Sequence, residues 1–63
     1  MIKKNDRVKI VDCAEANLYG HIIFDVVSNP WQLGHGAWVT RITSDEKDIT
    51  GGFAVKFLNK VLE

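Results

Sequence analysis

Residues 21–28 read His-Ile-Ile-Phe-Asp-Val-Val-Ser and form the clearest strand pattern in the sequence. Ile22, Phe24 and Val26 fall on one face of an extended chain, and the residues between them fall on the other. Both faces are largely apolar, which favours a strand that is covered on both sides. Because a strand has to pair with neighbours, we expect further strands before and after this segment.

The chain before this strand predicts a second strand and a short helical segment. In residues 7–12 the apolar Val8 and Ile10 alternate with the charged Arg7 and Lys9, which is the pattern of a half-buried strand. Asp12 is followed three residues later by Glu15, and this spacing fits a capping box at the start of a helix. We therefore expect a helical turn or a structured loop over Cys13–Tyr19, ended by Gly20.

The chain after the central strand predicts three more strands. Pro30 has no backbone N–H to donate and ends the central strand region. β-branched residues favour a strand over 37–43, and a strand interrupted by glycines follows at 49–55. One tight helical turn is expected at 56–59, before a short last strand at 60–62.

Five short strands separated by close turns predict a small, mainly β protein, an antiparallel barrel with one or two short helical turns. Closing the sheet into a barrel would remove its exposed edges. The strand at 37–43 has apolar side chains in both of its rows, one with Trp38 and one with Val39, so either row fits a core. We expect residues 1–63 to form a single domain, because 63 residues are too few for two.

Composition and charge exclude several classes of protein. Hydrophobic residues make up 46% of the chain and eight basic residues balance eight acidic ones, which excludes a disordered tail. The basic excess of a general nucleic-acid binder is absent. The longest apolar run is three residues, so we expect neither a membrane span nor a signal peptide. Cys13 is the only cysteine, and the lack of an intrachain disulfide leads us to expect a cytoplasmic protein.

The C-terminal segment Gly51–Val61 resembles the end of a Src-homology-3-like barrel. It keeps the glycine, two aromatic residues and two aliphatic residues of the family pattern, which are Gly51, Phe53, Phe57, Leu58 and Val61. The opening at 5–10 resembles the polar-polar-x-Val start of many such barrels, including ribosomal-type KOW modules. The resemblance implies a five-stranded antiparallel Src-homology-3-like barrel.

Two positions depart from the family pattern. Ala54 replaces the family's proline and Lys56 replaces its asparagine, and both positions line the family's polyproline groove. The resemblance therefore implies the fold, and not the binding of proline-rich peptides. Plasmid-type dihydrofolate reductases share this barrel class, but their Val-Gln-Ile-Tyr active-site strand has no match here, so their activity is not carried over.

The sequence offers few residues for catalysis. Its nucleophilic and imidazole groups are Cys13, His21 and His35, and no spacing brings them together. A zinc site needs about four ligands at close spacing, which one cysteine and two distant histidines do not supply. We therefore expect no catalytic residues, no metal and no cofactor.

The aromatic residues are the candidate binding residues. The segment 29–31, Asn-Pro-Trp, places a tryptophan beside a proline in a loop, where it either packs over the barrel or contacts a ligand. We expect a non-catalytic binding or adaptor module that recognises a protein or peptide partner through an aromatic groove. The groove residues are Tyr19, Trp31, Trp38 and Phe57. A rim formed by Asp25, Glu15 or Asp12 would favour a basic or neutral peptide.

Two alternatives stay open. The first is a weak nucleic-acid-binding module of KOW type, with a basic stripe along the first and last strands. Its residues would be Lys3, Lys4, Arg7, Lys9, Lys56 and Lys60. The second is an enzyme whose site forms only at the symmetry axis of an oligomer. We expect a monomer or a small homo-oligomer, without a membrane partner.

Overall fold

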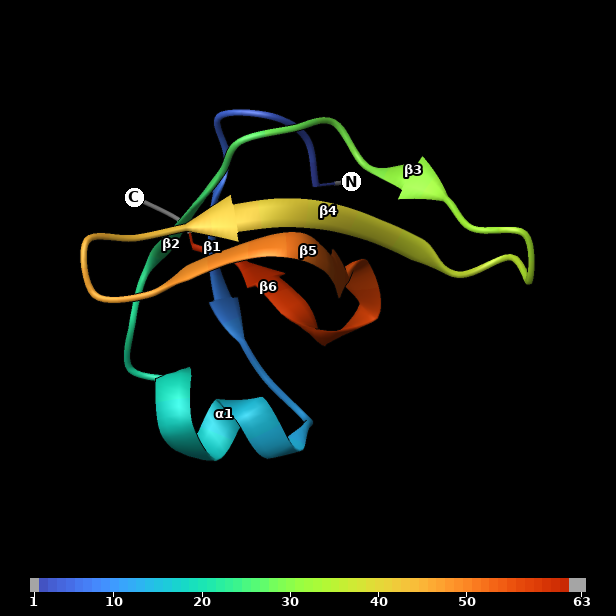
Figure 1. Cartoon of the computed structure of the whole chain (residues 1–63). Helices are drawn as coiled ribbons and strands as arrows, with labels where there is room; N and C mark the ends of the chain where they lie inside the picture. The colour runs from blue at the N-terminus through green and yellow to red at the C-terminus, as the bar shows by residue number, and fades with distance from the viewer. Residues whose placement is uncertain (1, 62–63) are drawn as a thin grey trace.

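The computed structural model describes residues 2–61 of the chain, apart from the side chain of Thr50. The protein is mainly β, with one short α-helix and one 3-10 turn (Figure 1). Its strands are β1 (Arg7–Ile10), β2 (Phe24–Val26), β3 (Trp31–Gln32), β4 (Trp38–Thr43), β5 (Asp48–Ala54) and β6 (Leu58–Lys60). The helix α1 (Ala14–Tyr19) connects β1 to β2, and the 3-10 turn η1 (Val55–Phe57) connects β5 to β6.

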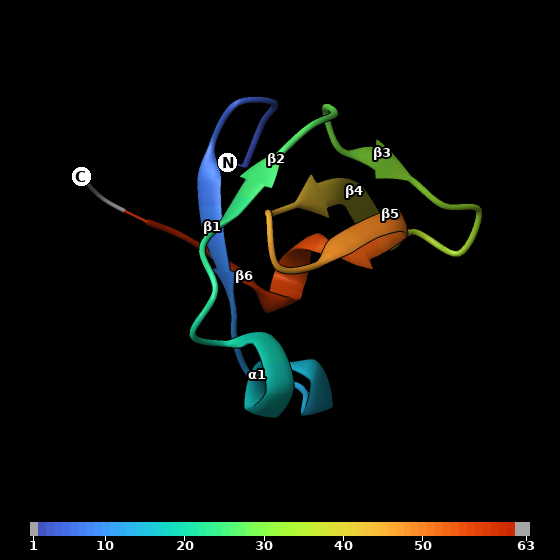
Figure 2. The ribbon, with the colours of Figure 1, turned by 60° about the vertical axis from the view of Figure 1, so that its left-hand side comes forward.

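All strand pairs of the sheet are antiparallel, as predicted. The strands follow the order β3-β4-β2-β1-β6, and β5 pairs with the remaining edge of β4. Figure 2 shows the β1–β2 pair running at an angle to the β4–β5 pair, so the sheet is strongly curved. Within residues 2–61, β5 and β6 are joined by η1 but do not pair, so the sheet is not closed.

Three details of the expected barrel differ from the structure. The described chain has six strands rather than five, because Trp31–Gln32, expected in a loop, pairs with β4 as β3. The described sheet is not closed into a barrel, because its last two strands, β5 and β6, are separated by η1 and do not pair. The last strand occupies Leu58–Lys60 instead of 60–62, and residue 62 lies outside the described part of the chain.

The helical segment lies where it was expected, but the predicted capping box is not formed. Cys13 and not Asp12 precedes the first helical residue, and no side chain described here caps α1. Asp12 has a φ of 59°, a left-handed conformation that aspartate adopts more readily than most residues. This turn redirects the chain before the helix begins, so the Asp12 side chain is not in the capping position.

The core confirms the alternation predicted for the central strand. Ile22, Phe24 and Val26 are buried, whereas Ile23 and Val27 are 49% and 41% exposed. The buried cluster consists of Ile2, Val8, Ile10, Ile22, Phe24, Val26, Ile42 and Leu58. The expectation that this strand is covered on both sides is wrong, because the second face of the strand, with Ile23 and Val27, is exposed to solvent.

In β4 the core row is the one that contains Thr40 and Ile42, which are both fully buried. The Thr40 hydroxyl donates a hydrogen bond of 2.7 Å to the carbonyl of Ser28, so this buried polar group is satisfied. By the alternation of the strand, Trp38 belongs to the same row. It is the first residue of β4 and lies beyond the end of the buried core. Its side chain is therefore 47% exposed.

Candidate ligand-binding groove

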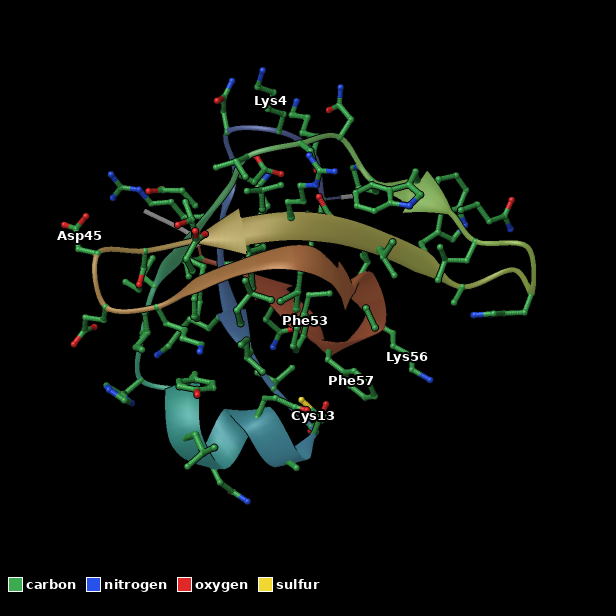
Figure 3. The ribbon with its side chains drawn as sticks, viewed as in Figure 1. Lys4, Cys13, Asp45, Phe53, Lys56 and Phe57 are labelled. Carbon is green, nitrogen blue, oxygen red and sulfur yellow. The ribbon has the colours of Figure 1, made fainter. Side chains whose placement is uncertain are left out.

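An apolar groove opens where β4 begins and β5 ends, and we call it the Trp38 groove. Its volume is about 320 Å³. Its lining residues are Pro30, Ala37, Trp38, Ala54, Val55 and Lys56. They come from the loop before β3, the start of β4, the end of β5 and η1. Figure 3 shows Lys56 projecting outward from η1 at this end of the molecule.

Small side chains leave room for this groove. Ala37 directly precedes β4, and Ala54 ends β5 opposite Val39. Neither alanine fills the space beside the indole of Trp38. The rigid rings of Trp38 and Pro30 provide the larger apolar surfaces, which suits a preformed binding site.

Among the described residues, Lys56 is the single charged residue of the groove lining. Its ammonium nitrogen lies 5.0 Å from the ring centroid of Phe57, which is a cation–π distance. No carboxylate of the described residues forms an ion pair with Lys56, in contrast to Lys60, whose Nζ lies 3.6 Å from Oδ1 of Asp6. Within residues 2–61, Lys56 therefore adds an unpaired positive charge to the apolar groove lining.

The two tryptophans point to opposite faces of the β3–β4 hairpin. Trp31 pairs with Val39, the neighbour of Trp38, and neighbouring residues of a strand alternate between faces. Trp31 packs over Gly52, where an added Cβ would lie 3.3 Å from the Cζ2 atom of the indole. The guanidinium carbon of Arg41 lies 5.6 Å from the centroid of the Trp31 ring. Trp31 is thus engaged by contacts within the protein, and it is not among the residues that line the groove.

Tyr19 and Phe57 also lie outside the groove lining. Tyr19 ends α1, packs against the core and has the ammonium of Lys47 at 5.5 Å from its ring centroid. Lys47 belongs to the β4–β5 turn, at the opposite end of β4 from Trp38. Phe57 follows Lys56 at the end of η1. The structure thus places one of the four predicted aromatic residues, Trp38, in the groove lining, and partner binding by any of them stays a prediction.

Most of the groove residues were not grouped with the aromatic residues by sequence reasoning. Pro30, Ala37 and Val55 carry no chemical signal that marks them as ligand contacts. Lys56 belongs instead to the predicted basic stripe of the nucleic-acid alternative. The signal that could have found Ala54 and Lys56 is the C-terminal pattern, because both stand at groove positions of the family it resembles.

The carboxylates expected around the aromatic patch lie away from the groove. Oδ1 of Asp25 lies 3.7 Å from Nε of Arg7, which makes an ion pair. Both residues line a second, polar hollow of about 250 Å³ together with Ile23, Ser44 and Asp45. Glu15 has a buried oxygen, Oε2, without a hydrogen-bond partner in the described chain, and Asp12 is exposed. None of the three expected acidic residues lines the Trp38 groove.

The six basic residues of the nucleic-acid alternative are spread over several elements. Arg7 faces Asp25 across β1 and β2, and Lys60 faces Asp6, so within the described residues two of the six cations have carboxylate partners. The other four lie in the turn before β1 (Lys3 and Lys4), on β1 (Lys9) and on η1 (Lys56). Figure 3 shows Lys4 far from Lys56, on the other side of β4. Nucleic-acid binding stays a prediction.

The residues considered for catalysis and metal binding lie on separate segments. Cys13 is half-buried before α1, His21 is exposed after α1, and His35 is exposed in the β3–β4 loop. Among residues 2–61, no three His, Cys, Asp or Glu side chains are grouped so that they could hold a metal ion. Within the same residues, no helix has the length and apolar character needed to cross a membrane.

Comparisons with protein-family models, with curated proteins and with solved structures find no match to this chain. The groove is therefore interpreted from its own geometry and charge.

Proposed function

We propose that this protein is a non-catalytic binding module that holds an extended segment of a protein partner in the Trp38 groove. The observation that carries the proposal is the half-exposed indole of Trp38 beside a hollow of about 320 Å³ lined by small apolar side chains. Ligand sites are typically preformed, mostly apolar hollows of roughly 300–1,000 Å³. Tryptophan is also enriched among the residues that dominate binding energy in protein interfaces.

We also propose that the fold is Src-homology-3-like. The order of the elements supports this assignment, since a helical turn precedes the last strand and β1 pairs with both β2 and β6. In the family that the C-terminal segment resembles, the positions of Ala54 and Lys56 line the peptide groove, and here both residues line the Trp38 groove. Because the family's proline and asparagine are replaced, a polyproline ligand is not expected.

The experiment that tests the proposed function compares the two faces of the β3–β4 hairpin. The protein is immobilised and used to select from a displayed library of random linear peptides, and the affinity of an enriched peptide is measured by titration. Trp38→Ala should lower this affinity by about tenfold or more, because it removes the largest apolar surface of the groove. Trp31→Phe is the matched control, since it changes the tryptophan that does not line the groove.

Amide NMR spectra of both variants report whether the fold is kept. The proposal fails if the wild-type protein enriches no peptide more strongly than the Trp38→Ala protein does. It also fails if the enriched peptides shift amide signals around Trp31 and leave those of the Trp38 groove unchanged.

A further inference from the structure

The Trp38 groove combines apolar walls with a cation that has no anionic partner in the described chain. Five of its six lining residues are apolar, and the sixth is Lys56. The Lys56 side chain is exposed, and its ammonium is placed over the ring of Phe57 at 5.0 Å. A cation–π contact uses one side of an ammonium group and leaves donors for a further acceptor.

Carboxylates are concentrated at the other end of the molecule. The β4–β5 turn and the first residue of β5 carry Asp45, Glu46 and Asp48, and Figure 3 shows Asp45 and Lys56 at opposite ends of the β4–β5 hairpin. The acidic residue closest to η1 through strand pairing is Asp12, because the N–H of the preceding residue, Val11, donates to the carbonyl of Phe57 at 2.8 Å. Asp12 neither lines the groove nor pairs with Lys56.

We propose that the ligand of the Trp38 groove is an acidic peptide segment, in which an apolar side chain lies against Trp38 and a neighbouring Asp or Glu carboxylate binds Lys56. This inference rests on the proposed function and specifies the ligand chemistry. It reverses the sequence-based expectation of a basic or neutral peptide, because the charged residue of the described groove lining is a lysine. Complementary charge selects the ligand and speeds its encounter, while the apolar contact supplies most of the affinity.

The test selects from one library of random linear peptides with three forms of the protein as bait. The wild-type protein should enrich peptides with Asp or Glu next to apolar residues. Lys56→Glu should lose this acidic preference and enrich Lys or Arg at the same position. Lys47→Glu is the matched control, because it makes the same charge change at a lysine that also lies over an aromatic ring, 5.5 Å from Tyr19, at the acidic end. It should leave the enriched pattern unchanged.

A second measurement gives the size of the effect with one enriched peptide. Replacing its Glu by Gln should weaken binding to the wild-type protein by up to about fivefold, the upper end of the range expected for a solvent-exposed ion pair. The same replacement should have no effect on binding to Lys56→Gln. Raising the salt concentration should weaken the Glu peptide more than the Gln peptide, since exposed charges are screened.

The outcomes separate this inference from the proposed function. Neutral or basic peptides that bind in a Trp38-dependent way would overturn the acidic ligand and keep the binding module. Acidic peptides that bind Lys56→Glu as well as the wild type would do the same. The absence of any Trp38-dependent peptide would overturn both.

Two other occupants of the groove are checked with the same samples. Light scattering over a range of protein concentrations reports self-association, and a dimer that Trp38→Ala abolishes would overturn the acidic peptide in favour of a second copy. A mobility shift with pooled RNA and DNA at about 50 mM salt, lost in Lys56→Glu, would overturn it in favour of a nucleic acid. We expect neither result.

Discussion

Trp31 and Trp38 stand on the paired strands β3 and β4, and their exposed fractions are similar at 36% and 47%. Their surroundings differ. Trp31 packs over Gly52 and lies beneath the guanidinium of Arg41, whereas Trp38 borders a hollow that no side chain of the described protein fills. The comparison shows that partial exposure does not identify a binding residue, because the same exposure is found in a residue that covers its own sheet.

The largest expected effect is the difference in protein stability between the variants Trp31→Ala and Trp38→Ala. Replacing a buried tryptophan by alanine costs about 3–5 kcal/mol, and Trp31 is about one-third exposed, so Trp31→Ala should lower the free energy of unfolding by about 2 kcal/mol. Trp38→Ala should cost less than about 1 kcal/mol, since fewer contacts are lost. Urea unfolding followed by circular dichroism measures both. Equal losses of unfolding free energy in the two variants would show that Trp38 also stabilises the fold by packing. The distinction between a packing tryptophan and a binding tryptophan would then fail.

The next effect concerns the hollow itself. Ala54→Leu extends a side chain into the Trp38 groove and should lower peptide affinity about tenfold, or about 1.4 kcal/mol, by occupying the ligand's place. The free energy of unfolding should change little, because the added side chain enters open space at the surface. Titration with an enriched peptide and urea unfolding give the two values. A variant that binds the peptide as well as the wild type would place the ligand elsewhere.

A smaller effect is expected at the glycine that Trp31 covers. Gly52 has a φ of 98°, and a Cβ there would lie 3.3 Å from the indole, so Gly52→Ala should destabilise the protein by about 1 kcal/mol or more. Gly51 is the control, because a Cβ added to it meets nothing within 4 Å. Gly51→Ala should change stability by no more than about 0.5 kcal/mol. If the two variants are equally stable in thermal unfolding, Trp31 does not press on β5.

The core and most strands could be predicted from the sequence, because their signal is local. The alternation in 21–28 places Ile22, Phe24 and Val26 inside, and the structure buries all three. The strand β3 has no such signal. It is two residues long, follows Pro30, and is a strand only because its register against β4 pairs Trp31 with Val39. Such pairing is a tertiary property that a single segment does not encode.

The groove was predictable only in part for the same physical reason. The sequence identifies Trp38 as a candidate, but a shift of one residue in strand register would move it to the other face of the sheet. The β4–β5 register also contains an irregularity between Thr40 and Ile42, where residues 50–52 of β5 oppose Arg41 alone. Because this bulge changes which residues meet across the hairpin, the proximity of Ala54 to Trp38 follows from the folded structure and not from spacing in the sequence.

The smallest effect tests whether the contact between Arg41 and Trp31 stabilises the fold independently of Trp38. The guanidinium lies 5.6 Å from the Trp31 ring, and such cation–π contacts at exposed sites contribute about 0.5–1 kcal/mol. Arg41→Met keeps an apolar stem over the ring and removes the charge, so it should lower the free energy of unfolding by about 0.5 kcal/mol.

In the Trp31→Ala background this loss should disappear, whereas in the Trp38→Ala background it should persist, because Arg41 contacts Trp31 and not Trp38. Urea unfolding of the wild type, the three single variants and the two double variants gives the coupling energies of Arg41 with Trp31 and of Arg41 with Trp38. A coupling to Trp38 as large as that to Trp31 would mean that the two faces of the hairpin are not independent, and the assignment of one tryptophan to stability and the other to binding would fail.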